Sequence, residues 1–305
     1  DIDIFVKIDE SVDTEEFESL GKRIGIESLR RYRPYMRYSD HPYVEAFIKG
    51  VRINIVPCYN VKMGNWKSAA DRSPFHTEYV KDNLNNEMIR HIRLLKRMLK
   101  SINVYGAEIA TNGFSGYVIE VLILKYCSLP SLLQAISDIK KEGNVFSINR
   151  VDEDIIKTFA SPLVIIDPVD SRRNLGSAIS NESAGKFVLA ARRFLQKPSL
   201  EFFIKEKRYA RPHEEIYPNL LVMEFGHNPR SPDIIWGQLK RSLDALSKQL
   251  ELVGFKVIKS TCITDEKRSA AFIFLLESIF LSPYTEKMGP EVFRKKETIN
   301  FISKN

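Results

Sequence analysis

The chain opens on a stretch in which apolar and polar positions alternate. The apolar positions are Ile2, Ile4, Val6 and Ile8. A period of two is typical of a β-strand with one buried face, and it places Asp1 and Asp3 together on the opposite face. Two carboxylates that point the same way can share a cation, and such hard oxygen ligands suit Mg²⁺. An acidic strand end exposed to solvent would show the same pattern, so the pair alone leaves both interpretations open.

The first sixty residues are predicted to run strand, helix, strand, strand. The helix covers residues 14–29, where apolar side chains recur along one side after a possible Asp13 or Thr14 cap. A basic, aromatic loop over residues 30–35 follows it. The two further strands cover residues 43–48 and 51–57, with a turn between them.

Asn54 lies in the last of these strands. Its neighbours Ile53 and Ile55 occupy one face, which leaves Asn54 on the other. If this strand pairs beside the first one, the Asn54 side chain approaches Asp1 and Asp3.

The middle of the chain carries a strongly amphipathic helix. An apolar stripe with a 3.6-residue period predicts it over residues 83–101, after a loop over residues 70–77 that contains His76. Lys96 lies on a second, cationic face of this helix together with Arg93 and Lys100. Because such a face is usually only solvated, charge alone does not identify a binding site here.

The remainder of the chain mixes helices and strands. An apolar segment over residues 118–126 is hydrophobic nearly all round and is therefore expected to be buried. The other predicted elements are helices over residues 131–141, 181–195 and 233–252 and strands over residues 163–166, 220–225, 255–262 and 270–276. In chain order the last four elements, from residue 220 to residue 276, run strand, helix, strand, strand, which is typical of a small split sandwich. The predicted fold class is therefore α+β.

Basic and aromatic residues are interleaved late in the chain. Eight Lys or Arg and two Glu lie between Lys186 and Arg211, with aromatic residues among them. This mixture suits the backbone and bases of a nucleic acid. Burial in a core would explain Phe187 and Phe194 equally well.

The composition is that of a soluble globular protein with two or three domains. The chain has 305 residues, 44% of them hydrophobic, and a net charge of +7 that favours a polyanionic partner. Its three cysteines are far apart and form no C-x-x-C, so we expect neither disulfides nor zinc, and a cytoplasmic location. The longest apolar run, residues 118–124, is too short to span a bilayer, so no membrane partner is expected.

Seven short motifs follow one another along the chain. They are Asp1-Ile2-Asp3-Ile4-Phe5, Ile55-Val56-Pro57-Cys58-Tyr59, Ala70-Asp71-Arg72-Ser73-Pro74-Phe75-His76, Arg93-Leu94-Leu95-Lys96, Val104-Tyr105-Gly106-Ala107-Glu108, Gly113-Phe114-Ser115-Gly116-Tyr117 and Asp167-Pro168-Val169-Asp170. Taken in this order, the chain resembles the archaeal, class I CCA-adding enzymes, the tRNA nucleotidyltransferases that build the CCA end without a nucleic-acid template. No single motif is decisive, but seven in register make the resemblance specific.

The resemblance implies a domain order and a set of partners. Residues 1–82 would form a head with a nucleotidyltransferase palm, and residues 83–143 a helical neck. Residues 144–305 would form a body and a tail that grip the acceptor stem and T-arm of tRNA. Family members are commonly dimeric, so a homodimer is possible.

The resemblance also implies a reaction. The 3′-hydroxyl of tRNA would attack the α-phosphate of CTP or ATP and release pyrophosphate, with two Mg²⁺ ions at the site. Asp1 and Asp3 match the first two metal carboxylates of the family, which makes them catalytic and metal-binding residues.

Four further residues match the nucleotide contacts of the family. His76, Lys96 and Tyr105 correspond to contacts with the triphosphate, and Arg173 to the arginine that helps to discriminate the incoming base. Donors and cations of these types suit phosphates and base edges. From the residues alone, Tyr105 could equally be a packing aromatic at a helix end. Arg173 could equally form an ion pair with Asp167 or Asp170.

Two features depart from the family pattern. Asn54 occupies the position of the third catalytic and metal-binding carboxylate, and an amide supplies no negative charge and cannot accept a proton. We therefore expect weakened metal binding and slower or absent nucleotide addition. The family also has a Gly-Ser motif and a helix before the first strand, so we expect that an N-terminal segment is missing from this sequence.

Two other functions remain open at this point. One is a tRNA-binding protein that has lost the chemistry through Asn54 and the missing start. The other is a related nucleotidyltransferase such as a poly(A) polymerase, whose substrate would be single-stranded RNA 3′ ends. The match of the second half of the chain to the CCA-adding body and tail disfavours the poly(A) polymerase.

Overall fold

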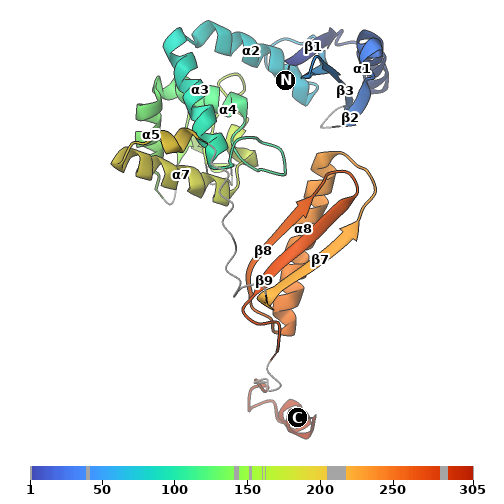
Figure 1. Cartoon of the computed structure of the whole chain (residues 1–305), viewed down its shortest axis with the longest axis vertical. Coiled ribbons are helices and arrows are strands. Elements are labelled where there is room, and N and C mark those ends of the chain that lie inside the picture. The colour runs from blue at the N-terminus through green and yellow to red at the C-terminus, as the bar shows by residue number, and fades with distance from the viewer. Residues whose placement is uncertain are drawn as a thin grey trace. The chain divides into compact units, whose positions relative to one another are not determined.

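The chain folds into two compact units (Figure 1). Unit 1 comprises Asp1–Tyr209 with Arg230–Gly237, and unit 2 comprises Ala210–Pro229 with Gln238–Asn305. The structure is a computed structural model that describes residues 2–38, 42–140, 144–150, 153–159, 161, 163–204, 218–281 and 288–304, with only the backbone of Tyr38 and Ile155.

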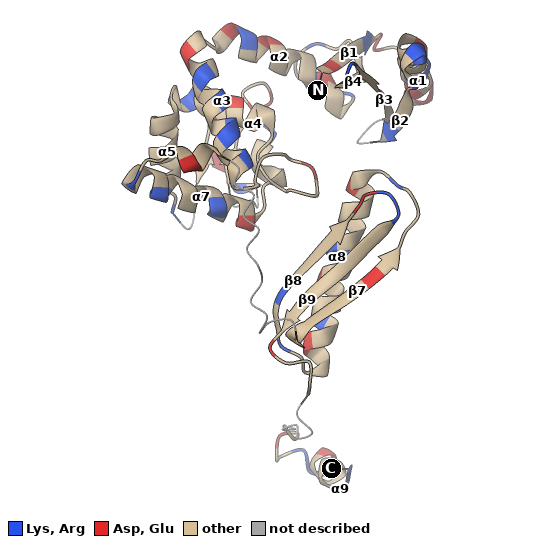
Figure 2. Ribbon diagram, in the orientation of Figure 1, with Lys and Arg blue, Asp and Glu red and all other residues tan. Residues whose placement is uncertain are grey.

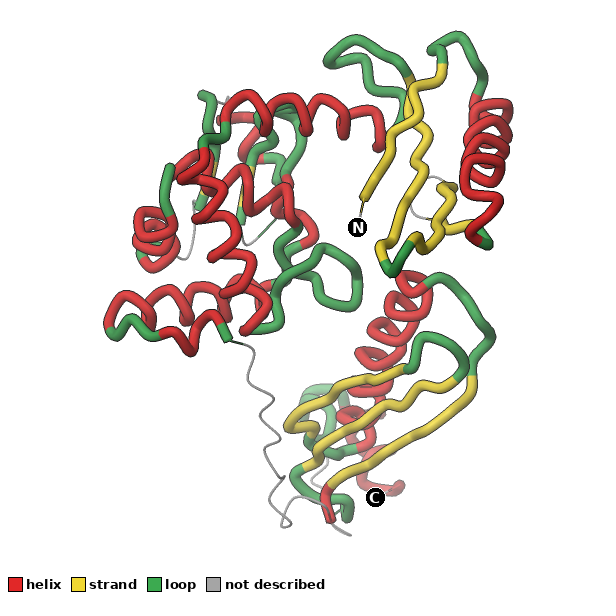
Figure 3. The backbone as a smooth tube through the Cα atoms, turned by 45° about the horizontal axis from the view of Figure 1, so that its top comes forward, coloured by secondary structure: helices red, strands yellow, loops and turns green. Residues whose placement is uncertain are grey.

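Unit 1 begins with a four-stranded sheet that carries one helix on a face (Figure 3). The strands are β1 (Ile2–Ile8), β2 (Tyr35–Tyr38), β3 (Pro42–Ile48) and β4 (Val51–Tyr59), in the spatial order β1-β4-β3-β2. Strand β1 runs parallel to β4, and the other neighbours are antiparallel. Helix α1 (Thr14–Leu29) packs on β3 and β4, and its cap Asp13 accepts a hydrogen bond from the Glu16 amide at 2.9 Å.

Two glycines allow α1 to lie close to the sheet. A Cβ atom at Gly21 would come within 2.7 Å of Pro57, and one at Gly25 within 2.5 Å of Val44. Any larger side chain at either position would therefore push the helix away from the strands. The helix occupies the predicted range, whereas β2 was not predicted: the stretch assigned to a loop forms the short helix η1 (Arg30–Tyr32) and the first residue of β2.

The apolar face of β1 is less buried than its alternation predicts. Ile8 is buried, but Ile2 is 51% exposed and Ile4 is 46% exposed. The period of two is therefore right, whereas the prediction of a fully buried face is wrong. The reason is that β1 is an edge strand, and α1 covers β3 and β4 instead.

The residues predicted as a loop around His76 are helical. The short helix η2 (Ala69–Asp71) leads directly into α2 (Arg72–Asn83). Pro74 lies in the first turn of α2, where no backbone N–H is needed, so it does not break the helix. Helix α3 (Asn86–Ser101) then starts at its own cap, Asn85, which accepts from the Met88 amide at 2.9 Å.

The rest of unit 1 is a helical body with one hydrophobic core. It contains α3, α4 (Gly116–Tyr126), α5 (Leu129–Ser137), β5 (Val145–Phe146), α6 (Glu153–Lys157), β6 (Val164–Ile165), η3 (Leu175–Ala178), α7 (Asn181–Gln196) and η4 (Leu200–Phe203). Fully buried side chains from α3, α4, α5 and α7 share this core. Each such leucine or phenylalanine contributes about 1.5–3 kcal/mol. We expected the neck to end at residue 143, but its core continues into α7.

The aromatic residues of α7 belong to this core. Phe187 is fully buried, and Phe194 packs edge-on against Phe202 and Phe203 with ring centroids 5.4 and 5.6 Å apart. Their role is packing, and the basic residues 205–211 lie outside the described part of the chain. No single helix of the described residues is long and apolar enough to cross a membrane; one pair, α4 with α5, reaches that length together but is bent by 96°.

Unit 2 has the predicted order of strand, helix, strand, strand. Its elements are β7 (Leu220–Gly226), α8 (Pro232–Val253), β8 (Val257–Thr264) and β9 (Ser269–Leu276), followed by α9 (Lys295–Lys304). The sheet is antiparallel in the order β7-β9-β8, and α8 lies along one face of it (Figures 1 and 3). Ser247 of α8 contacts Ser260 of β8 at 3.2 Å on that face.

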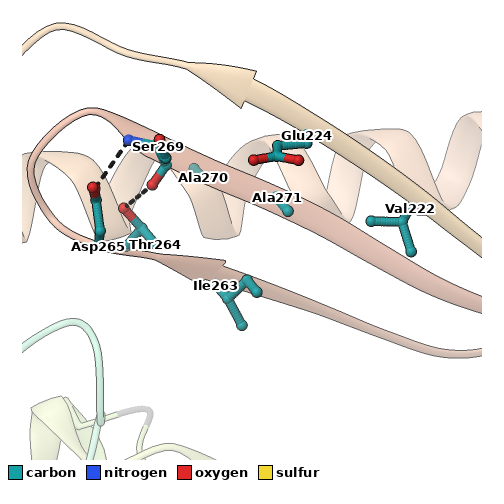
Figure 4. Close-up of a pocket in the computed structure, with 8 residues that line it drawn as sticks. All are labelled: Val222, Glu224, Ile263, Thr264, Asp265, Ser269, Ala270 and Ala271. Atoms are coloured by element: carbon teal, nitrogen blue, oxygen red, sulfur yellow. Dashed lines mark hydrogen bonds between the residues drawn. The ribbon is translucent and has the colours of Figure 1, made fainter.

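The other face of the sheet in unit 2 carries a cleft of about 450 Å³ (Figure 4). Its walls are Val222, Ile263 and small residues, with the two carboxylates Glu224 and Asp265. Three backbone amides hydrogen-bond to Asp265 and hold its pKa at about 2. An apolar cleft with two carboxylates repels phosphate groups, so it does not suit a nucleotide.

Candidate nucleotide and metal site

Asp3 on β1 and Asn54 on β4 lie side by side. The parallel register of β1 and β4 sets them directly opposite each other, and the Asn54 amide donates from Nδ2 to Asp3 Oδ1 at 2.7 Å. The other amide atom, Asn54 Oδ1, is buried and has no hydrogen-bond partner within the described residues. Asp1, the second predicted metal carboxylate, lies outside the described residues.

These donors fit Mg²⁺ by type but not by charge. Asp3 and the Asn54 carbonyl are hard oxygen ligands, but only Asp3 is charged. Nowhere in the described ranges do three or more His, Cys, Asp or Glu side chains gather as a metal site. The Asn54 amide would also have to rotate to present Oδ1 to a cation beside Asp3. That rotation would break the hydrogen bond from Asn54 Nδ2 to the Asp3 carboxylate.

A second carboxylate lies in the same row of the sheet. Glu45 on β3 pairs with Asn54 in register and is only 2% exposed. It accepts the hydroxyl hydrogen bond of Tyr35 and lies 3.7 Å from Arg37 Nε, both on β2. The Glu45 carboxylate is therefore already held by β2. Sequence reasoning missed it because a charged residue inside a strand is usually assigned to the solvent face.

Lys96 and Tyr105 meet at the start of α4. A Cβ atom built on Gly116, the first residue of α4, would lie 3.7 Å from the Tyr105 hydroxyl and 3.8 Å from Lys96 Nζ. Helix N-termini carry free N–H groups and a partial positive charge, and such ends bind phosphates. Glu120, one turn further along α4, holds Lys96 Nζ at 3.3 Å. We call this arrangement the α4 cradle. Figure 2 shows the Lys and Arg positions of the α3 ribbon in blue.

Two sequence motifs hold the α4 cradle in place. Tyr105 forms a backbone bridge with Phe114, and the Gly106 and Gly113 amides donate hydrogen bonds within the same loop at 2.8 Å. A side chain at Gly113 would collide with the Val104 carbonyl, so only glycine fits there. The spacing of these motifs therefore reflects direct contact between them.

His76 and Arg173 meet at Asp167. The His76 Nε2 atom lies 2.8 Å from Asp167 Oδ2, and Arg173 Nη1 lies 3.8 Å from the same oxygen. Tyr117 of α4 stacks on the His76 ring at 4.0 Å and donates its hydroxyl to Asp167 Oδ1 at 3.1 Å. Because Tyr117 follows Gly116, the first turn of α4 contacts both the His76 group and the Lys96 group.

Arg173 also borders a cleft of about 870 Å³. Trp66 and Arg72 line this cleft, and the Arg72 guanidinium lies 5.3 Å from the Trp66 ring centre. Arg72 Nε donates to Asp170 Oδ2 at 2.7 Å. Arginine groups beside an aromatic face suit a nucleotide, since they bind phosphate and stack on bases.

Arg72, the first residue of α2, was not predicted because its stretch was assigned to a loop, and Trp66 was not predicted because it lies in an irregular loop. That loop, residues 60–68, is held by the fully buried Asp71. Asp71 accepts hydrogen bonds from the backbone amides of Tyr59, Lys67 and Ser68 at 2.7–2.8 Å. A loop shaped by one carboxylate has no period, so the only available signal was Asp71 itself within its motif.

The family models that match this chain cover most of its length. The description "tRNA nucleotidyltransferase, second domain" matches residues 90–204, and "CCA-adding enzyme, C-terminal domain" matches residues 218–305. Among solved structures, Cid1 poly(U) polymerase aligns with a TM-score of 0.51 and 12% identity over 67% of this chain and 80% of that chain. A second Cid1 structure gives a TM-score of 0.50 and 13% identity, with coverage of 68% and 82%. These two likenesses show a mixed α+β fold of the nucleotidyltransferase kind.

Curated relatives match nearly the whole chain. The CCA-adding enzyme of Pyrobaculum neutrophilum is 38% identical over 96% of this chain and 68% of its own length. Those of Methanocaldococcus jannaschii and Saccharolobus shibatae are 35% and 36% identical over 100% of this chain and 70% and 72% of their own lengths. The chain therefore belongs to the archaeal-type CCA-adding enzymes, a family of tRNA nucleotidyltransferases.

Proposed function

We propose that this chain adds C, C and A to the 3′ end of tRNA from CTP and ATP. The 3′-hydroxyl attacks the α-phosphate, the bond to the β-phosphate breaks, and pyrophosphate leaves. The observation that carries this proposal is the α4 cradle, where Lys96, Tyr105 and the helix N-terminus converge beside Gly116. Those groups have the charge and the donors that a leaving pyrophosphate needs.

Each member of the α4 cradle has a separate role. Lys96 supplies a positive charge, which Glu120 holds over the end of the helix. Tyr105 supplies a hydroxyl donor, and the first backbone N–H groups of α4 supply further donors with the helix dipole behind them. As negative charge builds on the leaving group, these donors are already in place and need no reorganisation.

Asp3 and Asn54, with Asp1, are the residues that would hold the metal. The family resemblance implies two Mg²⁺ ions, which neutralise charge on the reacting phosphate when bound. Asp3 remains to accept the proton of the attacking hydroxyl, since the Asn54 amide cannot. Because Asn54 also lowers the negative charge of the site, we propose that this chain binds Mg²⁺ weakly and adds nucleotides slowly.

Arg173 and the cleft beside it are proposed to receive the incoming nucleotide. Its guanidinium is 44% exposed and borders a cleft of about 870 Å³ that Trp66 and Arg72 also line. A guanidinium can read base edges through two hydrogen bonds, which is the type of contact that discriminates bases.

The domain roles follow from the family match. We propose a head over residues 1–82 and a neck that starts at residue 83 and, because the core is shared, continues through α7. The part matched as the C-terminal domain, residues 218–305, is proposed to form the body and tail that grip the acceptor stem and T-arm. The net charge of +7 supports a tRNA partner, and a homodimer is part of the same proposal.

The test is extension of tRNA that lacks its CCA end by labelled CTP and ATP with Mg²⁺. Lys96→Ala is expected to slow extension by about a hundredfold, the usual effect of losing one donor to a leaving or developing charge. Arg90→Ala, an exposed change on the same helix, is the matched control. Equal rates for Lys96→Ala and Arg90→Ala would overturn the role of the α4 cradle.

A second candidate function has one observation in its favour. The Asn54 amide donates a hydrogen bond to Asp3, so one oxygen of the Asp3 carboxylate already has a partner from the chain itself. A chain that grips tRNA but performs no chemistry would keep this arrangement. Such a protein would shift tRNA on a native gel and yet incorporate no label at any Mg²⁺ or Mn²⁺ concentration.

A further inference from the structure

We propose that Asp167 is a positioning residue that aims the His76 imidazole at the triphosphate of the incoming nucleotide. The inference rests on the proposed function, because it assumes that His76 contacts the triphosphate. Asp167 itself is fully buried, so it is not exposed to a bound nucleotide and would act through His76.

The Asp167 carboxylate is held on both oxygens. Oδ1 accepts from the Tyr117 hydroxyl at 3.1 Å and from the Val169 amide at 3.0 Å. Oδ2 lies 2.8 Å from His76 Nε2 and 3.8 Å from Arg173. A carboxylate with this many partners has one orientation, and it imposes that orientation on the groups around it.

Asp167 is ionised at neutral pH. Burial opposes its ionisation, but the hydrogen bond and charge of His76 outweigh burial, with help from the Val169 amide and Tyr117, and the pKa of Asp167 stays below its usual range. Burial, reinforced by Asp167, raises the pKa of Tyr117, so that hydroxyl keeps its proton and remains a donor. An ionised Asp167 can only accept, which makes Nε2 of His76 the protonated nitrogen.

This tautomer leaves Nδ1 of His76 on the opposite edge of the ring. Within the described residues Nδ1 has no hydrogen-bond partner, and stacking on Tyr117 at 4.0 Å keeps the ring in place. Nδ1 therefore lies on the ring edge that a phosphate oxygen can approach, and the negative charge of Asp167 balances a ring that donates from both nitrogens. The ionisable groups around the ring are Asp167, Tyr117 and Arg173, with Tyr79 of α2 beyond Tyr117.

The helix that carries His76 is anchored by a second pair. Arg72 lies one turn before His76 on α2 and donates to Asp170, three residues after Asp167. The loop between these carboxylates is closed by its own backbone, since Asp167 N donates to Arg173 O at 3.0 Å and Arg173 N to Asp170 O at 2.9 Å. These backbone bonds, rather than the Asp167 side chain, place Arg173 at the edge of the nucleotide cleft, so Asp167→Asn leaves that placement intact.

The test compares binding of CTP and CMP to the full chain and to Asp167→Asn. CMP lacks the β- and γ-phosphates. Loss of the His76 contact should therefore weaken CTP binding about tenfold, as for one charge-assisted hydrogen bond, and change CMP binding by less than about twofold. A double-mutant cycle with His76→Gln checks the route. If Asp167 acts through His76, Asp167→Asn has no further effect in the His76→Gln background.

Asp170→Asn is the matched control, because it removes the neighbouring carboxylate of the same loop, which binds Arg72 instead. Its effect is expected to fall on CTP and CMP alike, because it frees Arg72 at the cleft and leaves the hydrogen bond between His76 and Asp167 in place. The proposal is overturned if Asp167→Asn weakens CMP as much as CTP, or if its effect simply adds to that of His76→Gln.

A second measurement covers the case in which Asp167→Asn does not fold. Nitrogen NMR of His76 in the unaltered chain is expected to show the proton on Nε2, and Tyr117→Phe is expected to give a smaller loss of CTP affinity than Asp167→Asn. A proton found on Nδ1 alone would overturn the inference. If the unaltered chain binds no CTP while His76 carries its proton on Nε2, the proposed function fails and the positioning role does not.

Discussion

Asn54→Asp should make the stability of unit 1 depend on Mg²⁺. The change removes the hydrogen bond from Asn54 Nδ2 to Asp3 at 2.7 Å and sets a second negative charge in its place. Glu45 lies next in the same row and adds to the repulsion. The lost charge-assisted hydrogen bond is worth about 1.5 kcal/mol at this exposed site, and repulsion near water adds about 1 kcal/mol.

Without metal, the variant should therefore lose roughly 2 kcal/mol or a little more in free energy of unfolding. For a unit of this size that lowers Tm by about 4–8 °C in EDTA. A cation bound between two carboxylates stabilises the folded chain. A Mg²⁺ concentration of a hundred times Kd adds about 2.7 kcal/mol to the free energy of unfolding. The unaltered chain, which has an amide in place of this carboxylate, should respond to Mg²⁺ much less.

The assay is a thermal melt of both proteins in EDTA and in a series of Mg²⁺ concentrations. Asn60→Asp, which introduces the same charge at an exposed position just beyond β4, is the control and should melt like the unaltered chain. If Asn54→Asp melts with the unaltered chain in EDTA, or gains nothing from Mg²⁺, the description of this site as a metal site in which an amide replaces a carboxylate is refuted.

Three further outcomes test the structure of unit 1. Asp71→Ala should lower the free energy of unfolding by about 3 kcal/mol or more in chemical denaturation, because three backbone amides, two of them in buried hydrogen bonds, lose their acceptor. The pKa of Asp167 in the folded chain lies below its unfolded value, so its contribution to stability is full above about pH 4 and is lost as the pH falls further. Asp167→Asn should therefore flatten the acid limb of a plot of stability against pH between about pH 5 and pH 2. Burial raises the pKa of Cys58 to about 11 and Cys262 is also buried, so a thiol reagent should label exposed Cys127 alone in the native chain and all three cysteines after unfolding.

Much of the structure of the first sixty residues could be predicted because it depends on local periodicity. The alternation in β1 and the neighbours of Asn54 placed Asp3 and Asn54 on one face, and β1 pairs with β4 as that placement requires. The cap and range of α1 followed from the same kind of signal. The burial of Ile2 and Ile4 could not be predicted, since it depends on which strands α1 covers.

The errors concern residues whose surroundings are distant in sequence. Residues 70–77 were predicted as a loop, but Pro74 in a first turn is compatible with a helix, and His76 lies on α2. Asp167 was visible only as part of a motif, because its partner His76 is 91 residues away. Trp66 had no pattern at all, since Asp71 shapes its loop.

Incorporation of labelled CTP into tRNA lacking its CCA end, by the unaltered chain and by Asn54→Asp at equal Mg²⁺, tests the central claim most directly. The account predicts slow incorporation by the unaltered chain and an increase of about tenfold or more in the variant, because a third carboxylate strengthens metal binding. Equal rates would contradict the role given to Asn54, and no incorporation by either protein would contradict the proposed function.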